Sequence, residues 1–192
     1  MMKIGIYVAL LAIVVASSAS ANEVYTFDQS QSKIGFKIHH FVGVTPGKFT
    51  KFSGKIDIDR EHPERSSVTA AIDVRSIDTG ILKRDEHLRS AEFFNAAKFP
   101  QINFRSRSCK QTGPQSADVI GDITMHGVTR SIVLHVDLTT VPSEVKRTRW
   151  SVTTAPLRRS EFGLMFSKTA EAISGIGQEV AIEIEIEATK AR

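Results

Sequence analysis

The sequence has 192 residues and contains one cysteine, one tryptophan and two tyrosines. A single cysteine excludes a disulfide within the chain, so the stability of the fold has to come from a hydrophobic core. The chain also lacks a large surplus of one charge, because 25 basic residues are interleaved with 21 acidic ones and the net charge is +4. It has no lysine- and arginine-rich block that could follow a phosphate backbone, which argues against nucleic acid as a partner.

Long apolar runs are also scarce. The one continuous run, Ile4 to Ala16, is short for a membrane span. Lys3 precedes it and Ala19-Ser20-Ala21 follows it, a pattern typical of a secretory signal peptide. We therefore expect residues 1–21 to be a signal peptide that is cleaved after Ala21. Residues 22–192 would then form a single periplasmic or secreted domain.

Motifs for catalysis and metal binding are absent from the sequence. There is no H-E-x-x-H and no G-x-S-x-G, and consecutive residues such as His39 and His40 point to opposite faces of a strand. The lone Cys109 has no recognisable base nearby in the sequence. It is either a buried, inert side chain or an exposed thiol that could pair between chains, and we favour the first. We expect a protein that is not an enzyme and has no metal site and no cofactor other than a bound ligand.

The sequence does contain repeated two-residue alternation of apolar and polar side chains, which predicts β-strands. In the segment 32–40, one face holds Ile34, Phe36, Ile38 and His40. Further inward positions on later strands are Phe52, Ile56, Ile72, Ile102, Phe104, Leu134, Ile182 and Ile184. Residues 41–48 contain two glycines and a proline, which indicates a turn. Because Phe49 is out of step with Phe52, we expect a bulge or bend near Ser53 and Gly54.

About eight such strands cannot lie in one open sheet with a bare apolar face, so they form either a barrel or a two-sheet sandwich. Residues near 82–97 differ, because charged residues and alanine there favour a short helix and Phe93, Phe94 and Phe99 lie in or just after it. Such an insert either plugs one end of the core or forms a lid over an apolar cavity. Since an insert caps a barrel more naturally, we predict an all-β, antiparallel barrel. Its interior would be either filled or able to hold one small ligand.

Five segments of the sequence together suggest a family. They are Ser32–Phe36 with His40, Gly47–Phe49 with Phe52 and Gly54, Asp85–Leu88 with Ser90, Phe93-Phe94 and Lys98–Phe104, Gly121–Thr129, and Arg159–Gly163. In this order the chain resembles the YceI-like family of polyisoprenoid-binding periplasmic proteins. The resemblance implies a lipocalin-like barrel whose elongated apolar cavity holds a long isoprenoid or other lipid, and it implies no catalysis.

If the resemblance holds, the inward residues named above would line the lipid site together with Phe93, Phe94, Phe99 and Phe162. At the mouth, His40 is either a structural histidine or a hydrogen-bond partner of the lipid head group. Arg84 or Arg159 could bind a phosphate, whereas Asp85 is expected to cap the helix. The alternative function is a non-catalytic interaction or stress module with a filled barrel. Transient membrane contact and homodimer formation are left open.

Overall fold

The computed structural model describes residues 22–41, 43–140, 146–166 and 175–191. The predicted signal peptide, residues 1–21, lies outside the described residues. Among the residues that are described, no helix has the length and apolar character needed to cross a membrane.

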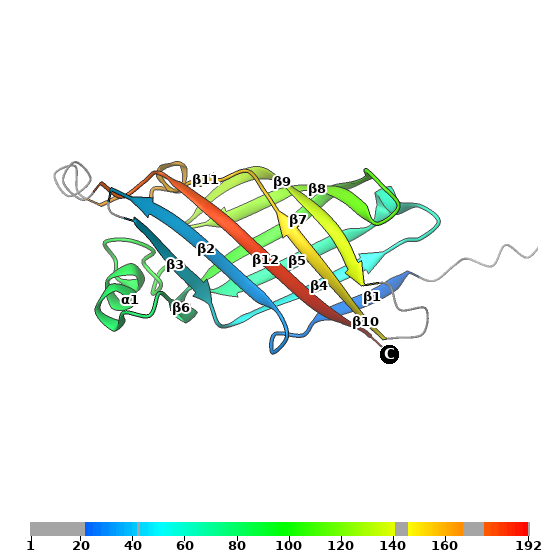
Figure 1. Ribbon diagram of the computed structural model, residues 1–192, viewed down its shortest axis with the longest axis horizontal. Coiled ribbons are helices and arrows are strands. Elements are labelled where there is room, and N and C mark those ends of the chain that lie inside the picture. The colour runs from blue at the N-terminus through cyan, green and yellow to red at the C-terminus, as the bar shows by residue number, and fades with distance from the viewer. Residues whose placement is uncertain (1–21, 42, 141–145, 167–174, 192) are drawn as a thin grey trace, which may run out of the picture.

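Eight antiparallel strands close into a barrel (Figure 1). In order around the barrel they are β1 (Glu23–Phe27), β4 (Phe52–Ile58), β5 (Ser67–Asp73), β7 (Gln101–Gln111), β8 (Ser116–Met125), β9 (Val128–Thr140), β10 (Arg147–Thr153) and β12 (Glu179–Lys190). The end of β12 pairs with β1, which closes the ring. Closure leaves an inner face on which apolar side chains can avoid water. The predicted all-β antiparallel barrel is therefore confirmed.

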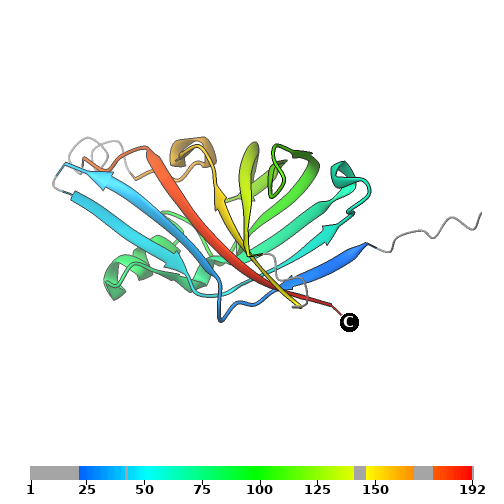
Figure 2. The same ribbon diagram turned by 45° about the vertical axis from the view of Figure 1, so that its right-hand side comes forward.

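Three further strands extend the barrel at one end: β2 (Lys33–His40), β3 (Gly43–Phe49) and β6 (Ile77–Asp78). β2 pairs with the first half of β12, β3 pairs with β2, and β6 pairs with the end of β3. The helix α1 (Leu82–Arg89), the two-residue β11 (Leu157–Arg158) and the short helix η3 (Arg159–Phe162) lie at this same end (Figures 1 and 2). We call it the helix end. The opposite end, with Glu23, Lys190 and the short helix η1 (Pro63–Arg65), is the terminal end.

The prediction of a turn over residues 41–48 is wrong, because residues 43–49 form β3. Pro46 lies opposite Lys37 of β2, on a part of β3 that pairs with β2 alone among the described strands. Proline is tolerated on such an edge, where no second neighbouring strand needs its missing N–H. Gly47 lies opposite Phe36. Its side-chain hydrogen leaves room for that ring, so it serves packing rather than a turn.

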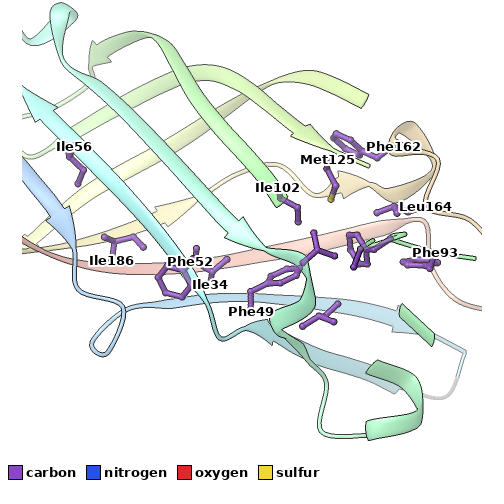
Figure 3. Close-up of a cluster of buried hydrophobic side chains, with 14 of the residues drawn as sticks. Ile34, Phe49, Phe52, Ile56, Phe93, Ile102, Met125, Phe162, Leu164 and Ile186 are labelled. Carbon is purple, nitrogen blue, oxygen red and sulfur yellow. The ribbon is translucent and has the colours of Figure 1, made fainter. Parts of the chain in front are cut away.

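The predicted bend exists, but it lies at Thr50 and Lys51 rather than near Ser53 and Gly54. There the backbone N–H of Thr50 donates to Ser76 O at 3.1 Å, in the short helix η2 (Val74–Ser76) that joins β5 to β6. Two residues outside the strands put Phe49 and Phe52 on the same inner side, and both are buried (Figure 3). The sequence therefore located the break in the alternation but not the residues that bend.

The helical insert is shorter than the predicted range of 82–97. α1 ends at Arg89, and turns follow as far as Lys98. The chain folds back on the helix, because Phe94 N donates to Leu88 O at 3.0 Å and Asn95 adopts a left-handed φ of 48°. The apolar residues lie on this returning segment, which buries Phe93 and Phe94 against the barrel.

The seam that closes the barrel is reinforced by charge at the terminal end. The Glu23 carboxylate of β1 accepts hydrogen bonds from Arg60 Nε at 2.8 Å and from Lys190 Nζ at 2.7 Å. Arg60 follows β4 and Lys190 ends β12, so one carboxylate joins the three strands that meet at the seam. The hydrogen bonds of Arg60, and then those of Lys190, lower the pKa of Glu23 from 4.5 to about 2.

This network makes the stability of the barrel depend on pH. Because the pKa of Glu23 is lower in the folded state, its stabilisation is present above the unfolded value of 4.5 and is lost as the pH falls towards about 2. We expect Glu23→Gln to lower the free energy of unfolding at pH 7 by about 1–2 kcal/mol, a value reduced by solvent screening of its exposed partners. The difference from the wild type should shrink at pH 3, as measured by urea unfolding.

The control is Glu61→Gln, which removes an exposed carboxylate from the turn that contains Arg60. It should change the stability by less than about 0.5 kcal/mol at either pH. A difference between Glu23→Gln and the wild type that stays constant from pH 7 to pH 3 would contradict the role given to this charge.

Candidate functional site

The barrel is hollow. An elongated cavity of about 600 Å³ runs inside it, with lining residues from the helix end, such as His40 and Arg84, to the terminal end, such as Asp59 and Ser116. All eight strands of the closed ring contribute side chains to the lining, which consists mainly of isoleucine, valine, leucine and phenylalanine. The volume falls within the range of about 300–1,000 Å³ that is usual for small-molecule sites. The interior that the sequence left open is therefore a lined cavity rather than a filled core.

Pairs of phenylalanine and glycine explain why large aromatic side chains leave this space free. A Cβ added to Gly47 would lie 2.2 Å from Phe36 Cζ, and one added to Gly54 would lie 2.2 Å from Phe27 Cε2. Both rings line the cavity. Each ring thus lies against a neighbouring strand in a space that any other side chain would occupy. The aromatic surface is spread along the wall rather than projected across the lumen.

Most of the residues predicted to bind a lipid line this cavity. They are Ile34, Phe36, Ile38, His40, Ile56, Ile72, Phe93, Phe94, Ile102, Phe104, Leu134, Ile182 and Ile184. Their inward position follows from strand alternation, which is the signal that the sequence provided. Their contact with a ligand stays a prediction.

Three of the predicted residues, Phe52, Phe99 and Phe162, are not part of the lining. Phe52 is buried in the wall, and Phe162 is only 1% exposed in the core at the helix end (Figure 3). The Phe99 ring packs edge-on against His126, with the ring centroids 4.9 Å apart. His126 Nδ1 in turn lies 3.0 Å from Phe162 O. Phe99 and Phe162 thus help to tie the β8–β9 turn to η3.

A chain of aromatic rings bounds the cavity at the helix end. The Phe49 and Phe94 ring centroids are 6.3 Å apart, those of Phe94 and Phe93 5.4 Å, and those of Phe93 and Phe166 4.9 Å. Phe93 and Phe94 are buried and also line the cavity. The insert therefore forms part of the cavity wall at this end. Its opening as a lid stays a prediction.

Polar groups of the lining at the helix end are held by neighbouring side chains. His40 Nε2 lies 2.6 Å from Thr45 Oγ1 across the β2–β3 pair, as expected of a structural histidine. Arg84 Nε donates to Thr79 Oγ1 at 2.7 Å, and its NH2 donates to Thr79 O at 2.8 Å. Thr79 also donates its backbone N–H to Asp85 Oδ1 at 2.9 Å. These contacts fix donor groups beside an apolar lumen.

The expected cap is not formed by Asp85. The residue before α1 is Ile81, which makes no side-chain cap, whereas the buried Asp85 carboxylate holds the loop at Thr79. His87, also part of the lining, places Nε2 2.9 Å from Glu92 Oε2. Asp85 is thus a loop anchor rather than a helix cap, because it lies one turn inside the helix, where it reaches back to the preceding loop.

Arg159 is the most buried charged residue in the described part of the chain, at 3% exposure. Its Nε donates to Gly177 O at 2.9 Å, its NH1 to Leu164 O at 2.9 Å and its NH2 to Ile176 O at 3.2 Å. The guanidinium therefore joins η3 to the segment before β12. Its side chain reaches the cavity lining, but its contacts with backbone carbonyls give it a clear structural role.

Sequence reasoning missed two side chains that make useful reporters of the cavity. Trp150, the one tryptophan in the sequence, lines the cavity in phase with Val152. Cys109 also lines it, because a register shift between Ser106 and Ser108 reverses the alternation of β7. Burial raises the pKa of the Cys109 thiol, so it stays protonated at neutral pH, in line with the inert state expected.

The lining offers little for acid–base or metal chemistry. Asp59 is its one carboxylate among the described residues, and Arg60, Arg84 and Arg159 are its cationic side chains apart from the histidines. In the described part of the chain, no three His, Cys, Asp or Glu side chains are grouped as a metal site. What the arrangement provides is a long apolar surface with fixed polar groups at its ends, which suits an elongated apolar ligand.

Proteins with related sequences are found in several bacteria. The UPF0312 protein of Ectopseudomonas mendocina is 37% identical over 133 residues, which are 66% of this chain and 70% of the relative. Protein YceI of Salmonella arizonae is 35% identical over 136 residues, which are 70% of this chain and 71% of the relative.

Solved structures share the fold. Burkholderia cenocepacia BcnA has a TM-score of 0.77 at 24% identity, covering 85% of this chain and 99% of its own. A polyisoprenoid binding domain from Saccharophagus degradans has a TM-score of 0.67 at 19% identity, covering 87% and 98%. The YceI-like domain, defined as a family, matches residues 25–188, which include part or all of every strand of the barrel. The chain therefore belongs to the YceI-like domain family.

Proposed function

We propose that this protein binds a long-chain lipid of the isoprenoid type inside its barrel and carries or stores it in the periplasm. The observation that carries the proposal is the elongated apolar cavity of about 600 Å³. The related Saccharophagus degradans structure, described as a polyisoprenoid binding domain, supports this class of ligand. The apolar run before Ala21 supports the periplasmic location. A polyprenyl chain, an isoprenoid quinone and a fatty amide or acid are the candidate ligands.

The physical basis is the removal of hydrocarbon from water. Each buried methylene contributes about 0.8 kcal/mol, so a chain of several isoprene units would gain tens of kcal/mol before ordering costs are subtracted. Non-covalent complexes do not exceed about 21 kcal/mol net. Even a ligand that fits the cavity loosely therefore keeps enough of this gross free energy of burial for stable binding. A groove on the surface would leave part of the tail in water, whereas a barrel encloses it.

The alternative function, an interaction module with a filled barrel, depended on an interior packed with side chains. Because the barrel contains a cavity, its interior is not packed in this way. Binding without catalysis is consistent with a lining that has one carboxylate among its described residues. Homodimer formation stays a prediction.

The direct test is whether the purified protein contains a lipid. We expect native mass spectrometry of the full chain, expressed with export, to show an added mass that is lost after organic extraction. The extract should contain a molecule with a long hydrocarbon chain. Protein without any bound lipid, whose Trp150 fluorescence also stays unchanged when an isoprenoid quinone is added, would contradict the proposal.

Arg84 provides a test of the ligand head group. Its guanidinium lines the helix end of the cavity and is oriented by Thr79. If it binds a phosphate, Arg84→Ala should weaken a polyprenyl phosphate by about tenfold or more, because charged hydrogen bonds contribute about 1.5–3 kcal/mol. An isoprenoid quinone should bind almost as before. Trp150 fluorescence measures both affinities.

The matched control is Lys83→Ala, which removes the neighbouring charge that does not line the cavity. It should leave both affinities within about twofold of the wild type, as expected for an exposed charge outside the site. Equal losses of affinity for the polyprenyl phosphate and the quinone in Arg84→Ala would discard a phosphate role for this residue, without contradicting the binding of a hydrocarbon tail in the cavity.

A further inference from the structure

Exposed apolar side chains gather at the helix end of the barrel. Six large apolar side chains are exposed among the described residues, and five of them lie there. These five, Phe41, Val44, Ile81, Leu82 and Met165, are called the apolar rim. Phe41 is 85% exposed and Leu82 is 69% exposed. Single exposed apolar residues are common on soluble proteins, but a cluster at one end of a cavity indicates a binding surface.

The rim is formed by three chain segments that lie at the same end of the molecule (Figures 1 and 2). Phe41 lies in the β2–β3 connection, Ile81 and Leu82 begin α1, and Met165 follows η3. The first and third segments are joined through the strand start at residues 177–178, because Gly177 N donates to His39 O at 2.7 Å and Arg159 N to Gln178 O at 2.9 Å. The α1 segment contacts the segment after η3 through His87 and Phe166, whose ring centroids are 5.5 Å apart.

The rim surrounds the end of the cavity but is not part of its lining. None of its five residues lines the cavity, whereas residues one or two positions away in sequence do: His40, Thr45, Arg84 and Leu164. The rim therefore faces outward around the place where the lining begins. A molecule that covers the rim would also cover this end of the cavity.

The terminal end has a different surface. Exposed residues there include Arg60, Glu61, Glu64 and Arg65, and no large apolar side chain is exposed among its described residues. The two ends of one apolar cavity thus differ in what they present to their surroundings. Among the described residues, it is the helix end that combines exposed large apolar side chains with residues lining one end of the cavity.

We infer that the apolar rim docks on the surface of a lipid bilayer and that lipid enters or leaves the cavity through the helix end. The inference rests on the proposed function in that the cargo is a membrane lipid. Such a lipid scarcely dissolves in water, so its exchange requires a cavity mouth in contact with the bilayer. Exposed apolar side chains on separate chain segments suit insertion into a fluid interface, and the exposed Lys83 beside Leu82 can reach lipid phosphates.

The test compares Phe41→Ser/Leu82→Ser with Val133→Ser on β9, which changes the one large apolar residue that is exposed outside the rim among the described residues. Flotation with vesicles of phosphatidylcholine and phosphatidylglycerol measures docking. Uptake of an isoprenoid quinone from the same vesicles, followed by Trp150 fluorescence, measures exchange. The double variant should lose about tenfold or more in both, given the apolar area removed. Val133→Ser should match the wild type.

A second binding measurement separates this inference from the proposed function. Quinone diluted from ethanol without vesicles should bind the double variant as tightly as the wild type, because the cavity is unchanged. Wild-type protein that binds this quinone but does not float with vesicles would overturn docking and leave the proposed function intact. Protein that floats but binds no quinone would contradict the proposed function alone.

Two further results would also overturn the inference. One is a loss of flotation in Val133→Ser as large as that in the double variant. The other is a wild-type dimer in analytical ultracentrifugation that becomes monomeric in the double variant while flotation is unchanged. That result would make the rim a contact between two copies of the chain.

Discussion

Phenylalanine rings packed against glycines of neighbouring strands are the constraint on which the cavity depends. An eight-stranded barrel has an interior that side chains can just fill, so a lumen exists only where side chains are kept to the wall. Phe36 over Gly47 and Phe27 over Gly54 meet this requirement. A side chain in place of either glycine would push the ring towards the lumen. The glycines therefore control the space available to a ligand, although they contribute no contact surface of their own.

The difference between patterns within one strand and contacts between strands explains which parts of the fold could be predicted from the sequence. Strand alternation identified the inward face of β2, β5 and β12, because each of these strands has one apolar side that is covered by the barrel. Local composition was misleading for β3, because Pro46 and Gly47 are typical of turns and the partner strand is not known from the sequence. Gly47 is required by the ring of Phe36, which is a contact between strands and is not visible in local composition.

Other features of the site were beyond the sequence for similar reasons. The short strand β1 was not singled out, yet its pairing with β4 and β12 closes the barrel and brings Glu23 to Arg60 and Lys190. Cys109 enters the lining through a register shift in β7, a backbone irregularity that simple alternation does not predict. The ends of the site depend on loops, and there the sequence named Arg84 and His40 without their partners.

The central claim is that the lumen is kept open for a hydrocarbon chain, and Gly47→Ala tests it most directly. The added Cβ would lie 2.2 Å from Phe36 Cζ, so the ring has to move into the cavity. The lipid bound by Gly47→Ala, measured by native mass spectrometry, should fall well below that of the wild type and should recover in Gly47→Ala/Phe36→Leu. Gly113→Ala, where a Cβ meets only Ser116 at ordinary contact distance, should leave it unchanged. Full lipid content in folded Gly47→Ala would contradict the account.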